Sequence, residues 1–492
     1  MSMQQQVLIN EKLQKVYWQS DQFVIPEKQS NVCGGKGLAK MLLSVRDTTS
    51  RHRTGQRLST KLTLLTQRAK RYRKNKCITL MHLFTEEYLM GCFRELKRNK
   101  APGIDGVSIE EYEINLKENI GELTAELRKW KYKPKPVKRV YIPKSDGSKR
   151  SLGIPTVRDK IVQMGIKKIL EAIFEVDFLD VSYGFRPKKN CHKALDKVSE
   201  AIMTKPVNHI VDMDIEKFFD TVNHKWLMRC LKQRIADTNF IRLIGRFLKT
   251  GVIEEGKYME SDKGTPQGGV LSPILANIYL HYILDLWFER VAKKQFKGYA
   301  EEVRYCDDFV CCFQKKQEAM KFEGMLKERL SKFGLKISEK KSKIIGFGRY
   351  ARQNAKAKGE KTATFDFLGF THYCDETITG KYKVGRKTSS KKFRQKMKAV
   401  NKWLKSIRNQ VELKEWWQVL RRKMTGHYNY YGISGNMQGI SKFHYNCTAL
   451  AYKWINRRSQ KKSYNFEQFN CFIKYNPLPK PKIYQSMYAL SS

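Results

Sequence analysis

The stretch V-R-Y-C-D-D-F-V-C-C-F, residues 303–313, decides the fold of this chain. Two adjacent acids, Asp307 and Asp308, separate two runs of β-branched, aromatic and cysteine residues. Such runs around a short polar pair predict a tight β-hairpin with the acids at its tip. Aspartate also favours turns for conformational reasons alone, so this pair by itself does not define a site.

A second acidic strand precedes this hairpin in the chain. Residues 209–215 read H-I-V-D-M-D-I and are followed by E-K-F-F-D. Strand alternation places Asp212 and Asp214 on one face and the apolar residues around them on the other. Carboxylates that converge from two strands offer the hard oxygen ligands and open positions that a pair of Mg²⁺ ions requires.

Composition indicates a polyanionic partner. The 492 residues suggest about three domains, and 41% hydrophobic residues suffice for a core. The chain has 96 Lys and Arg against 48 Asp and Glu, a formal charge of +48. Self-repulsion of that size opposes compaction unless a polyanion binds. Aromatic residues, 12% of the chain, interleave with the basic ones and suit stacking on unpaired bases.

Several classes of protein are not expected. None of the eleven cysteines forms a C-x-x-C pair, which argues against a structural zinc module. The absence of a secretory signal favours reduced thiols in a cytoplasm. The most apolar stretch, residues 268–288, is interrupted by polar residues, so a membrane span is not expected.

An ordered set of motifs resembles the group II intron-encoded reverse transcriptase/maturase family. The two acidic segments correspond to that family's catalytic blocks, R-Y-C-D-D-F (304–309) and V-D-M-D-I-E-K-F-F-D (211–220). The other motifs are R-N-K-A-P-G-I-D-G-V (98–107), V-Y-I-P-K-S-D-G-S-K-R-S-L-G-I-P-T (140–156), S-Y-G-F-R-P (182–187), G-T-P-Q-G-G-V-L-S-P-I-L-A-N-I-Y-L (264–280), F-D-F-L-G-F (365–370) and G-H-Y-N-Y-Y-G (426–432). They lie in family order and cover roughly residues 60–490, so the resemblance does not depend on one short motif.

The resemblance implies an α+β right-hand polymerase with a helical thumb. We expect a basic N-terminal extension over 1–76, fingers over 77–208, a palm over 209–375 and a thumb, or maturase domain, over 376–492. Residues 51–76 contain ten Lys or Arg and no acid, which predicts a solvated face or an RNA-gripping arm. Apolar spacing predicts two amphipathic thumb helices, one around 393–407 and one around 447–455, with basic outer faces.

A hairpin around Ser145-Asp146-Gly147 carries two candidate nucleotide ligands. Its turn places Lys144 and Arg150 at the two ends. Lysine can bind a triphosphate as a point charge and arginine can bind it bidentately. By resemblance, these two residues contact the phosphates of the incoming nucleotide.

Four further residues are nucleotide contacts by resemblance. Phe219 would pack under the deoxyribose and exclude a 2′-hydroxyl, which selects dNTP by a clash with the wrong substrate. Gln267 belongs to the loop against the primer–template, and Lys341 to the palm near the nucleotide. Arg186 would lie in the fingers beside template and nucleotide. From the residues alone, each has an ordinary structural interpretation. Phe219 could be an aromatic core residue, Lys341 a solvated surface residue, and Arg186 and Gln267 loop residues.

The family pattern selects the catalytic acids. An acid followed by Ile, with an aromatic five residues on, matches Asp214 and not its rival Asp212. Asp214, Asp307 and Asp308 would hold two Mg²⁺ ions while a primer 3′-hydroxyl attacks the α-phosphate of a dNTP. Cys306 departs from the family, which commonly has Ala there. Thiols are soft ligands, so Cys306 is expected to pack rather than bind metal.

We therefore predict an RNA-directed DNA polymerase that also binds its intron RNA to promote splicing and retrohoming. Its partners would be group II intron RNA, an RNA template with a DNA or RNA primer, target DNA and dNTPs, in a cytoplasmic ribonucleoprotein particle. No HNH endonuclease motif follows the predicted thumb. Two alternatives stay open: a domesticated defence or diversity-generating reverse transcriptase, and a splicing maturase with little polymerase activity.

Overall fold

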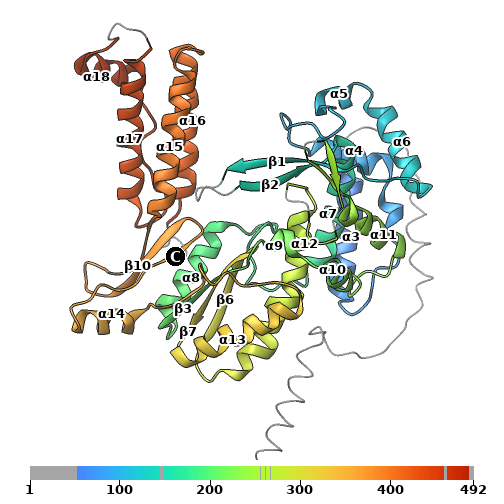
Figure 1. Cartoon of the computed structure of the whole chain (residues 1–492), viewed down its shortest axis with the longest axis horizontal. Helices are drawn as coiled ribbons and strands as arrows, with labels where there is room; N and C mark the ends of the chain where they lie inside the picture. The colour runs from blue at the N-terminus through green and yellow to red at the C-terminus, as the bar shows by residue number, and fades with distance from the viewer. Residues whose placement is uncertain are drawn as a thin grey trace, which may run out of the picture.

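The computed structural model describes residues 53–143, 149–254, 256–260, 262–265, 268–458 and 463–486. These residues form a right hand (Figure 1). A helical fingers region carries the projecting hairpin of β1 and β2, a sheet-based palm lies at the centre, and a helical thumb stands above the palm. The predicted α+β right-hand architecture is confirmed.

The palm is built on a sheet in the order β6-β7-β3-β8. Strand β7 pairs antiparallel with β6 on one side and with β3 on the other. Strand β3 also pairs antiparallel with β8. One face packs on the main core through Met213 and Phe309, and the other packs on a second core through Ile210 and Val310. The strands are β3 (His209–Asp214), β6 (Ala300–Tyr305), β7 (Asp308–Phe313) and β8 (Lys343–Gly346).

Helices cover both faces of the palm sheet. Helix α13 packs on β3 and β7, while α8 packs on β6 and β7 from the other side. The palm region also contains several short helices and helical turns. The bounds are α8 (Cys191–Thr204), α9 (Phe218–Thr221), α12 (Ser272–Leu280), α13 (Lys316–Lys332), α14 (Arg349–Ala357), π-helical turns at His281–Asp285 and Phe288–Ala292, and a 3₁₀ turn at Lys293–Gln295.

The fingers combine helices with a sheet in the order β2-β1-β4-β5, so β4 and β5 (residues 252–259) join the fingers sheet although the sequence analysis assigned them to the palm. The predicted hairpin is present, because β1 (Val137–Pro143) pairs antiparallel with β2 (Lys149–Ile154). Side-chain caps begin several helices, such as Thr156 before α7 and the Ser108–Glu111 capping box before α5. The remaining bounds are α4 (Glu86–Arg94), α5 (Ile109–Ile114), α6 (Leu116–Arg128), α7 (Val157–Phe174), α10 (His224–Leu231), α11 (Thr238–Lys249), β4 (Val252–Glu254), β5 (Lys257–Met259) and a 3₁₀ turn at Met81–Leu83.

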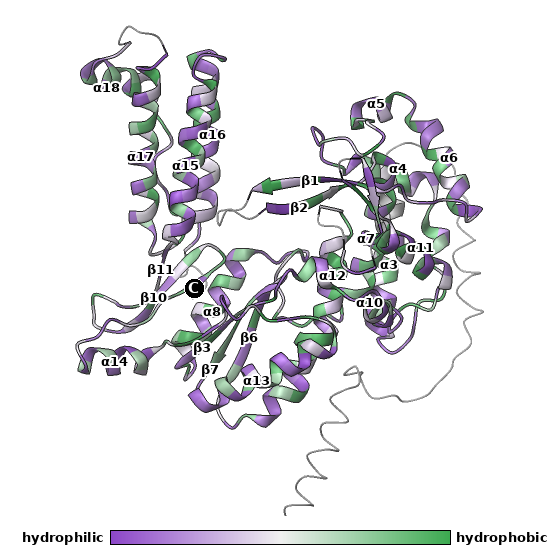
Figure 2. Ribbon diagram, viewed as in Figure 1, coloured by the Kyte–Doolittle hydropathy of each residue, from purple (hydrophilic) through white to green (hydrophobic). Residues whose placement is uncertain are grey.

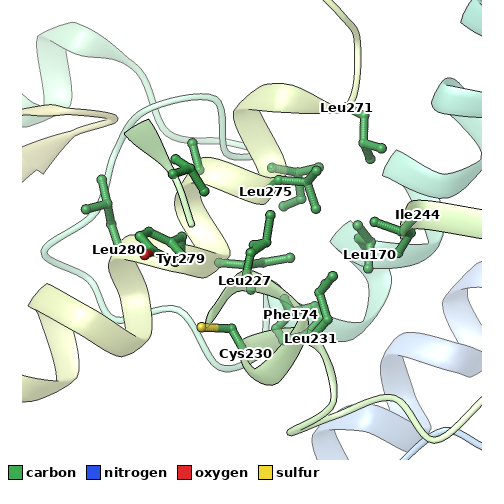
Figure 3. Packing of buried hydrophobic residues seen from close by; sticks show 14 of the residues in the cluster. Leu170, Phe174, Leu227, Cys230, Leu231, Ile244, Leu271, Leu275, Tyr279 and Leu280 are labelled. Carbon is green, nitrogen blue, oxygen red and sulfur yellow. The ribbon is translucent and has the colours of Figure 1, made fainter. Parts of the chain in front are cut away.

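The main core joins fingers and palm. Leu170 and Phe174 of α7 meet Leu227 of α10, Ile244 of α11 and Leu275 of α12 (Figure 3). These side chains are almost fully excluded from solvent. A single hydrophobic cluster therefore holds the fingers helices against the palm helix that follows the G-T-P-Q-G-G loop.

The basic stretch 51–76 is largely helical. Helix α3 (Arg53–Arg71) packs against α7. Leu62 and Leu65 contact the main core, and the carbonyl of buried Ala69 accepts a hydrogen bond from Arg234 (2.9 Å). The solvated-face prediction fits its exposed cations, whereas a free arm does not fit the described residues. The segment packs as a helix because apolar residues recur along one side of it among the cations, and this side is buried against the core.

A small sheet links palm and thumb, in the order β11-β10-β9. Strands β9 (Phe365–Phe367) and β10 (Phe370–Glu376) enclose a turn in which Leu368 and Gly369 both have positive φ, as a tight hairpin requires. Strand β11 (Tyr382–Thr388) leads into the thumb helices. These are α15 (Ser390–Ile407), α16 (Leu413–Tyr431), α17 (Met437–Ile455) and α18 (Phe466–Tyr475).

The predicted amphipathic helices of the thumb are confirmed. Val400 and Leu404 of α15 face Cys447 and Trp454 of α17 in a separate core. The opposite faces are polar, and hydrophilic residues alternate with apolar ones along α15, α16 and α17 (Figure 2). Among the described residues, no helix is long and apolar enough to cross a membrane.

Candidate functional site

The register of the palm sheet brings the predicted acids together. Asp214, the last residue of β3, lies directly opposite Asp308, the first residue of β7. Cys306 and Asp307 form the turn between β6 and β7, because Tyr305 pairs with Asp308. The sequence-predicted hairpin with the acids at its tip is therefore confirmed, and the three carboxylates gather at one edge of the sheet.

The electrostatics of this edge are those of crowded carboxylates. Burial raises the pKa of Asp307, and the charge of Asp214 adds to the rise. Partial removal from water by the surrounding protein raises the pKa of Asp308, and the neighbouring carboxylates raise it further. The Asp308 side chain nevertheless remains exposed to solvent on one side. Like charges at short range disfavour ionisation. A bound cation would relieve that repulsion.

Asp212 lies on the same face but further from the edge. It sits opposite Val310 of β7 and Lys343 of β8. Burial, then the charges of Asp214 and Asp366, raise its pKa to about 7. The geometry therefore favours Asp214 over Asp212 as the partner of Asp308.

These carboxylates are suitable oxygen ligands for a divalent cation. Asp214, Asp307 and Asp308 would hold it, since β3 opposes Asp214 to Asp308 next to the turn that carries Asp307. In the described part of the chain, no group of three or more acidic, histidine or cysteine side chains is already arranged with metal-site geometry.

Two cations face the acids. Lys341 Nζ donates to Asp214 Oδ2 at 2.8 Å. The Lys341 loop is fixed to β3, because the Ser338 N–H donates to the Asp214 carbonyl at 2.8 Å. From the fingers, the charge of Arg150 on β2 partly offsets the rise in the pKa of Asp307. The structure thus brings Arg150 and Lys341 to the site, whereas Lys144 and Gln267 lie outside the described residues.

Phe219 follows the catalytic strand and is half-buried. Its ring meets Phe218 edge-on, with 5.3 Å between centroids. The Phe219 carbonyl accepts a hydrogen bond from the Thr265 N–H at 2.7 Å. Gly264, at φ +83°, has no room for a side chain there, because a Cβ would lie 2.7 Å from the Phe219 carbonyl oxygen. The G-T-P-Q-G-G loop and the predicted sugar-selecting residue therefore form one unit.

Arg186 does not fit a direct nucleotide contact. Its side chain is buried, and the guanidinium donates to Glu175 (2.9 Å) and to the carbonyls of Leu179 (2.6 Å) and Ser182 (2.7 Å). Its remaining N–H groups also reach Glu175 and the Phe178 carbonyl. All donors of the fork are thus engaged within the protein. This corrects the expectation: Arg186 supports the S-Y-G-F-R-P loop.

That loop packs directly on the catalytic turn. Gly184 lies so close to the Cys306 backbone that a Cβ would collide with it. The Tyr183 N–H donates to the Arg304 carbonyl (2.8 Å), and Asn277 donates to the Gly184 carbonyl (2.7 Å). The motif therefore supports the β6–β7 turn through close backbone contacts.

Arg304 is a buried support of the β6–β7 turn that the sequence analysis missed. It is fully buried and pairs bidentately with Asp285, with both nitrogen–oxygen distances 2.6 Å. It also donates to Ser182 Oγ (2.9 Å) and to the carbonyl of Cys306 (2.8 Å). Cys306 has φ +62°, a left-handed conformation that is costly outside glycine. The buried arginine thus anchors the strained residue next to Asp307.

The F-D-F-L-G-F turn reaches the acids from the thumb side. A backbone hydrogen bond from Leu368 stabilises the charged form of Asp308. Tyr430 of α16 donates its hydroxyl to the Leu368 carbonyl at 2.8 Å, and Phe370 stacks on Tyr430 with 5.7 Å between centroids. The G-H-Y-N-Y-Y-G motif therefore connects the thumb to the catalytic edge.

A fingers–palm–thumb hand with paired strand carboxylates at its centre defines a nucleic-acid polymerase. The reverse transcriptase (RNA-dependent DNA polymerase) family matches residues 142–372, which include all three acids. Similar proteins include Protein YkfC of Escherichia coli K12, which is 33% identical over 322 residues, 57% of this chain and 84% of that protein.

Intron-encoded proteins are also similar. The group II intron-encoded protein LtrA of Lactococcus lactis is 40% identical over 190 residues, 38% of this chain and 31% of LtrA. The putative COX1/OXI3 intron 1 protein of Saccharomyces cerevisiae is 34% identical over 213 residues, 43% of this chain and 25% of its own length. The alignments thus span about a third or less of these two relatives.

The chain belongs to the reverse transcriptases, in the group of group II intron-encoded reverse transcriptases and maturases. Members of this family are RNA-directed DNA polymerases that use divalent metal ions, and the position of the three acids agrees with that activity.

Proposed function

We propose that this chain copies RNA into DNA at the edge of the palm sheet where Asp214, Asp307 and Asp308 meet. The observation that carries the proposal is the register of β3 against β7, which opposes Asp214 to Asp308 beside the Asp307 turn. The substrates are an RNA template, a DNA or RNA primer and dNTPs. The reaction is attack of the primer 3′-hydroxyl on the α-phosphate with loss of pyrophosphate.

Two Mg²⁺ ions are the proposed cofactors. The three carboxylates supply hard oxygen ligands from two strands and a turn, and their crowding favours a cation. The ions held by Asp214, Asp307 and Asp308 would supply Lewis-acid chemistry: a lower pKa for the attacking hydroxyl and stabilisation of the pyrophosphate leaving group. The protein supplies position and electrostatic field.

Arg150 and Lys341 are the proposed triphosphate ligands among the described residues. Lys341 pairs with Asp214, and the charge of Arg150 partly offsets the rise in the pKa of Asp307. The Lys341–Asp214 pair is largely exposed, with 65% and 41% of the two side chains accessible. Exposed pairs contribute little stability, about 0–1 kcal/mol. Lys341 can therefore leave Asp214 and bind phosphate when substrate arrives, and Lys144 remains a proposed partner in the same role.

Phe219 is the proposed sugar selector. Its backbone is held by Thr265 and its ring is braced by Phe218. A braced ring rejects a bulkier sugar more effectively than a mobile one, because it cannot move away from the 2′-hydroxyl. Gln267, next to this unit in the chain, stays a proposed contact to the nucleotide pocket.

The second proposed activity is binding of group II intron RNA, which promotes splicing and retrohoming into target DNA. The support is the charge of +48 and the basic outer faces of the thumb. Arg394, Lys398 and Arg457 are exposed on α15 and at the end of α17. Spaced cations of this kind suit an A-form backbone, which proteins recognise by shape. The resulting complex would be a cytoplasmic ribonucleoprotein particle.

A matched pair of variants tests the polymerase assignment. Asp214→Asn should abolish primer extension on an RNA template, whereas Asp212→Asn, on the same strand face, should retain it. Both changes are isosteric, and melting temperatures would verify folding. Equal loss in the two variants, or full activity of Asp214→Asn, would overturn the assignment of Asp214.

A further inference from the structure

The C-terminus of α6 carries a residue that its backbone geometry disfavours. The Lys131 N–H donates to the Glu126 carbonyl (2.9 Å), and the Trp130 N–H donates to the Leu127 carbonyl (3.3 Å). These two bonds define a Schellman motif with Trp130 at the C′ position. Trp130 has φ +59°. Glycine is the usual residue at that position, because L side chains are strained in the left-handed region.

The Trp130 side chain is only partly covered by its neighbours. It is 42% exposed, so much of its surface is open to solvent. A residue in this conformation that was selected for folding alone would be glycine or asparagine. A strained backbone conformation at an exposed aromatic residue indicates that the side chain serves binding rather than folding stability.

Trp130 forms one wall of a small open hollow between α6 and α11. The other walls come from residues of these helices and neighbouring segments: Met81, Leu127, Tyr132, Asn239, Arg242, Leu243 and Arg246. Arg246 is fixed, since it donates to the carbonyls of Trp130 (3.2 Å) and Tyr132 (2.6 Å). Arg242, one turn before it on α11, is exposed. The hollow thus combines an exposed indole with an exposed guanidinium.

The chain segment that carries Trp130 is strongly basic. Residues 128–138 read R-K-W-K-Y-K-P-K-P-V-K and contain no acid. Arg128, Lys129, Lys131 and Lys133 are all exposed beside Trp130. An aromatic platform within a cationic groove is the arrangement that binds single-stranded nucleic acid, because bases stack while cations contact the backbone.

We propose that this hollow binds an unpaired base of the RNA that the chain carries, outside the stretch being copied. The base stacks on Trp130, and Arg242 contacts the adjoining phosphate. The location favours this RNA over the primer–template, because α6 and α11 lie on the side of the fingers away from the palm (Figure 1). The proposal rests on the RNA binding proposed above, and it adds a specific site and a preference for unpaired bases.

Trp130→Gly provides the test, because glycine suits the backbone while removing the ring. Affinities for a labelled single-stranded oligouridylate and for a perfectly paired RNA duplex would be measured at one salt concentration. Stacking by one aromatic side chain predicts a loss of about fivefold to a hundredfold for the single strand. Duplex affinity should change by less than about twofold. The melting temperature should stay equal or rise.

Two further variants sharpen the result. Trp130→Phe keeps a ring at the same backbone angle and should retain most of the affinity for oligouridylate. Arg242→Gln should weaken binding and reduce its salt dependence by about one counterion. Each of these outcomes supports the site.

Other outcomes overturn it. Unchanged oligouridylate affinity in Trp130→Gly, or equal losses for single strand and duplex, would exclude base stacking. A lower melting temperature would make Trp130 a structural residue. If the unsubstituted chain binds neither RNA, both this site and the proposed RNA binding fail. If the unsubstituted chain binds both RNAs and Trp130→Gly binds both with unchanged affinity, only this site fails.

Discussion

The buried Arg304–Asp285 pair offers a sharp test of how the catalytic turn is held. Asp285→Asn keeps the shape of the side chain and removes its charge. Arg304 would then be an uncompensated cation, since its side chain and that of Asp285 are both 0% exposed. Breaking one partner of a buried pair costs about 3–5 kcal/mol.

Two features of the structure refine that magnitude. Arg304 keeps hydrogen bonds to Ser182, Asn277 and the Cys306 carbonyl in the variant. Burial and the charge of Asp285 raise the pKa of the adjacent Glu302, so that removing Asp285 lets Glu302 ionise more readily. We therefore expect the lower end of the range, about 3 kcal/mol. At ~2–4 °C per kcal/mol, the melting temperature should fall by about 6–12 °C.

A double variant separates stability from positioning. Arg304→Met with Asp285→Leu replaces the pair by apolar side chains, which is often neutral or stabilising for buried pairs. The melting temperature should therefore recover. The Cys306 carbonyl still loses its anchor, so kcat for primer extension should remain about tenfold to a hundredfold low, as expected for a loss of roughly 1.5–3 kcal/mol. The dNTP KM should change little.

The refuting results are specific. A double variant with recovered stability and unchanged kcat would show that the pair only stabilises the palm. A fall of less than about 2 °C in Asp285→Asn would contradict the buried charge pair itself. Both measurements use thermal denaturation and steady-state extension on the same protein preparations.

Three further predictions concern substrates. Arg150→Ala should raise the dNTP KM about tenfold or more through loss of a charge-assisted contact. Lys138→Ala, on the same hairpin, should leave the dNTP KM unchanged. An equal rise in both variants would mean that the overall positive charge of the hairpin matters rather than a contact of Arg150 with the nucleotide. Phe219→Ala should admit ribonucleotides in primer extension with little loss of dNTP use, and continued exclusion would return Phe219 to the core. RNA affinity should fall on the order of 10³–10⁵ between 50 and 200 mM salt if 6–10 phosphates are contacted, less for single strands, and a salt-insensitive Kd would contradict the charge argument.

The catalytic edge was largely predictable because its signals are local. Alternation in β3 fixes which face carries Asp214, and the polar pair between two apolar runs fixes the turn at Asp307. The thumb helices were predictable for the same reason, since their apolar spacing matches the helical repeat. These patterns lie within single elements and need no knowledge of distant contacts.

The buried residues that hold the Asp307 turn in place were not predictable from the sequence. The partner of Arg304 lies 19 residues earlier, in a π-helical turn, and an arginine within an apolar strand gives no indication of which acid it meets. Arg186 looked like a ligand because its motif resembles a substrate block, but Glu175 and nearby carbonyls engage it. Such pairings depend on tertiary packing, which sequence spacing does not encode.

Helix α3 and Trp130 show two further limits. The ten cations of residues 51–76 obscured a short apolar stripe that packs on the fingers. The strain at Trp130 is a backbone property, and it became visible only as a positive φ. An exposed tryptophan in a basic segment is nevertheless a signal that can be sought in the sequence.

The most direct test of the account is one purified variant, Asp307→Ala, in two assays. Asp307 lies in the catalytic turn, and the proposed RNA-binding thumb faces lie on other elements. The account predicts that primer extension on an RNA template falls below detection, while protein-assisted splicing of the intron RNA at near-physiological Mg²⁺ is retained. Retained extension would contradict the assigned catalytic site. Loss of both activities would contradict the separation of polymerase and RNA-binding surfaces.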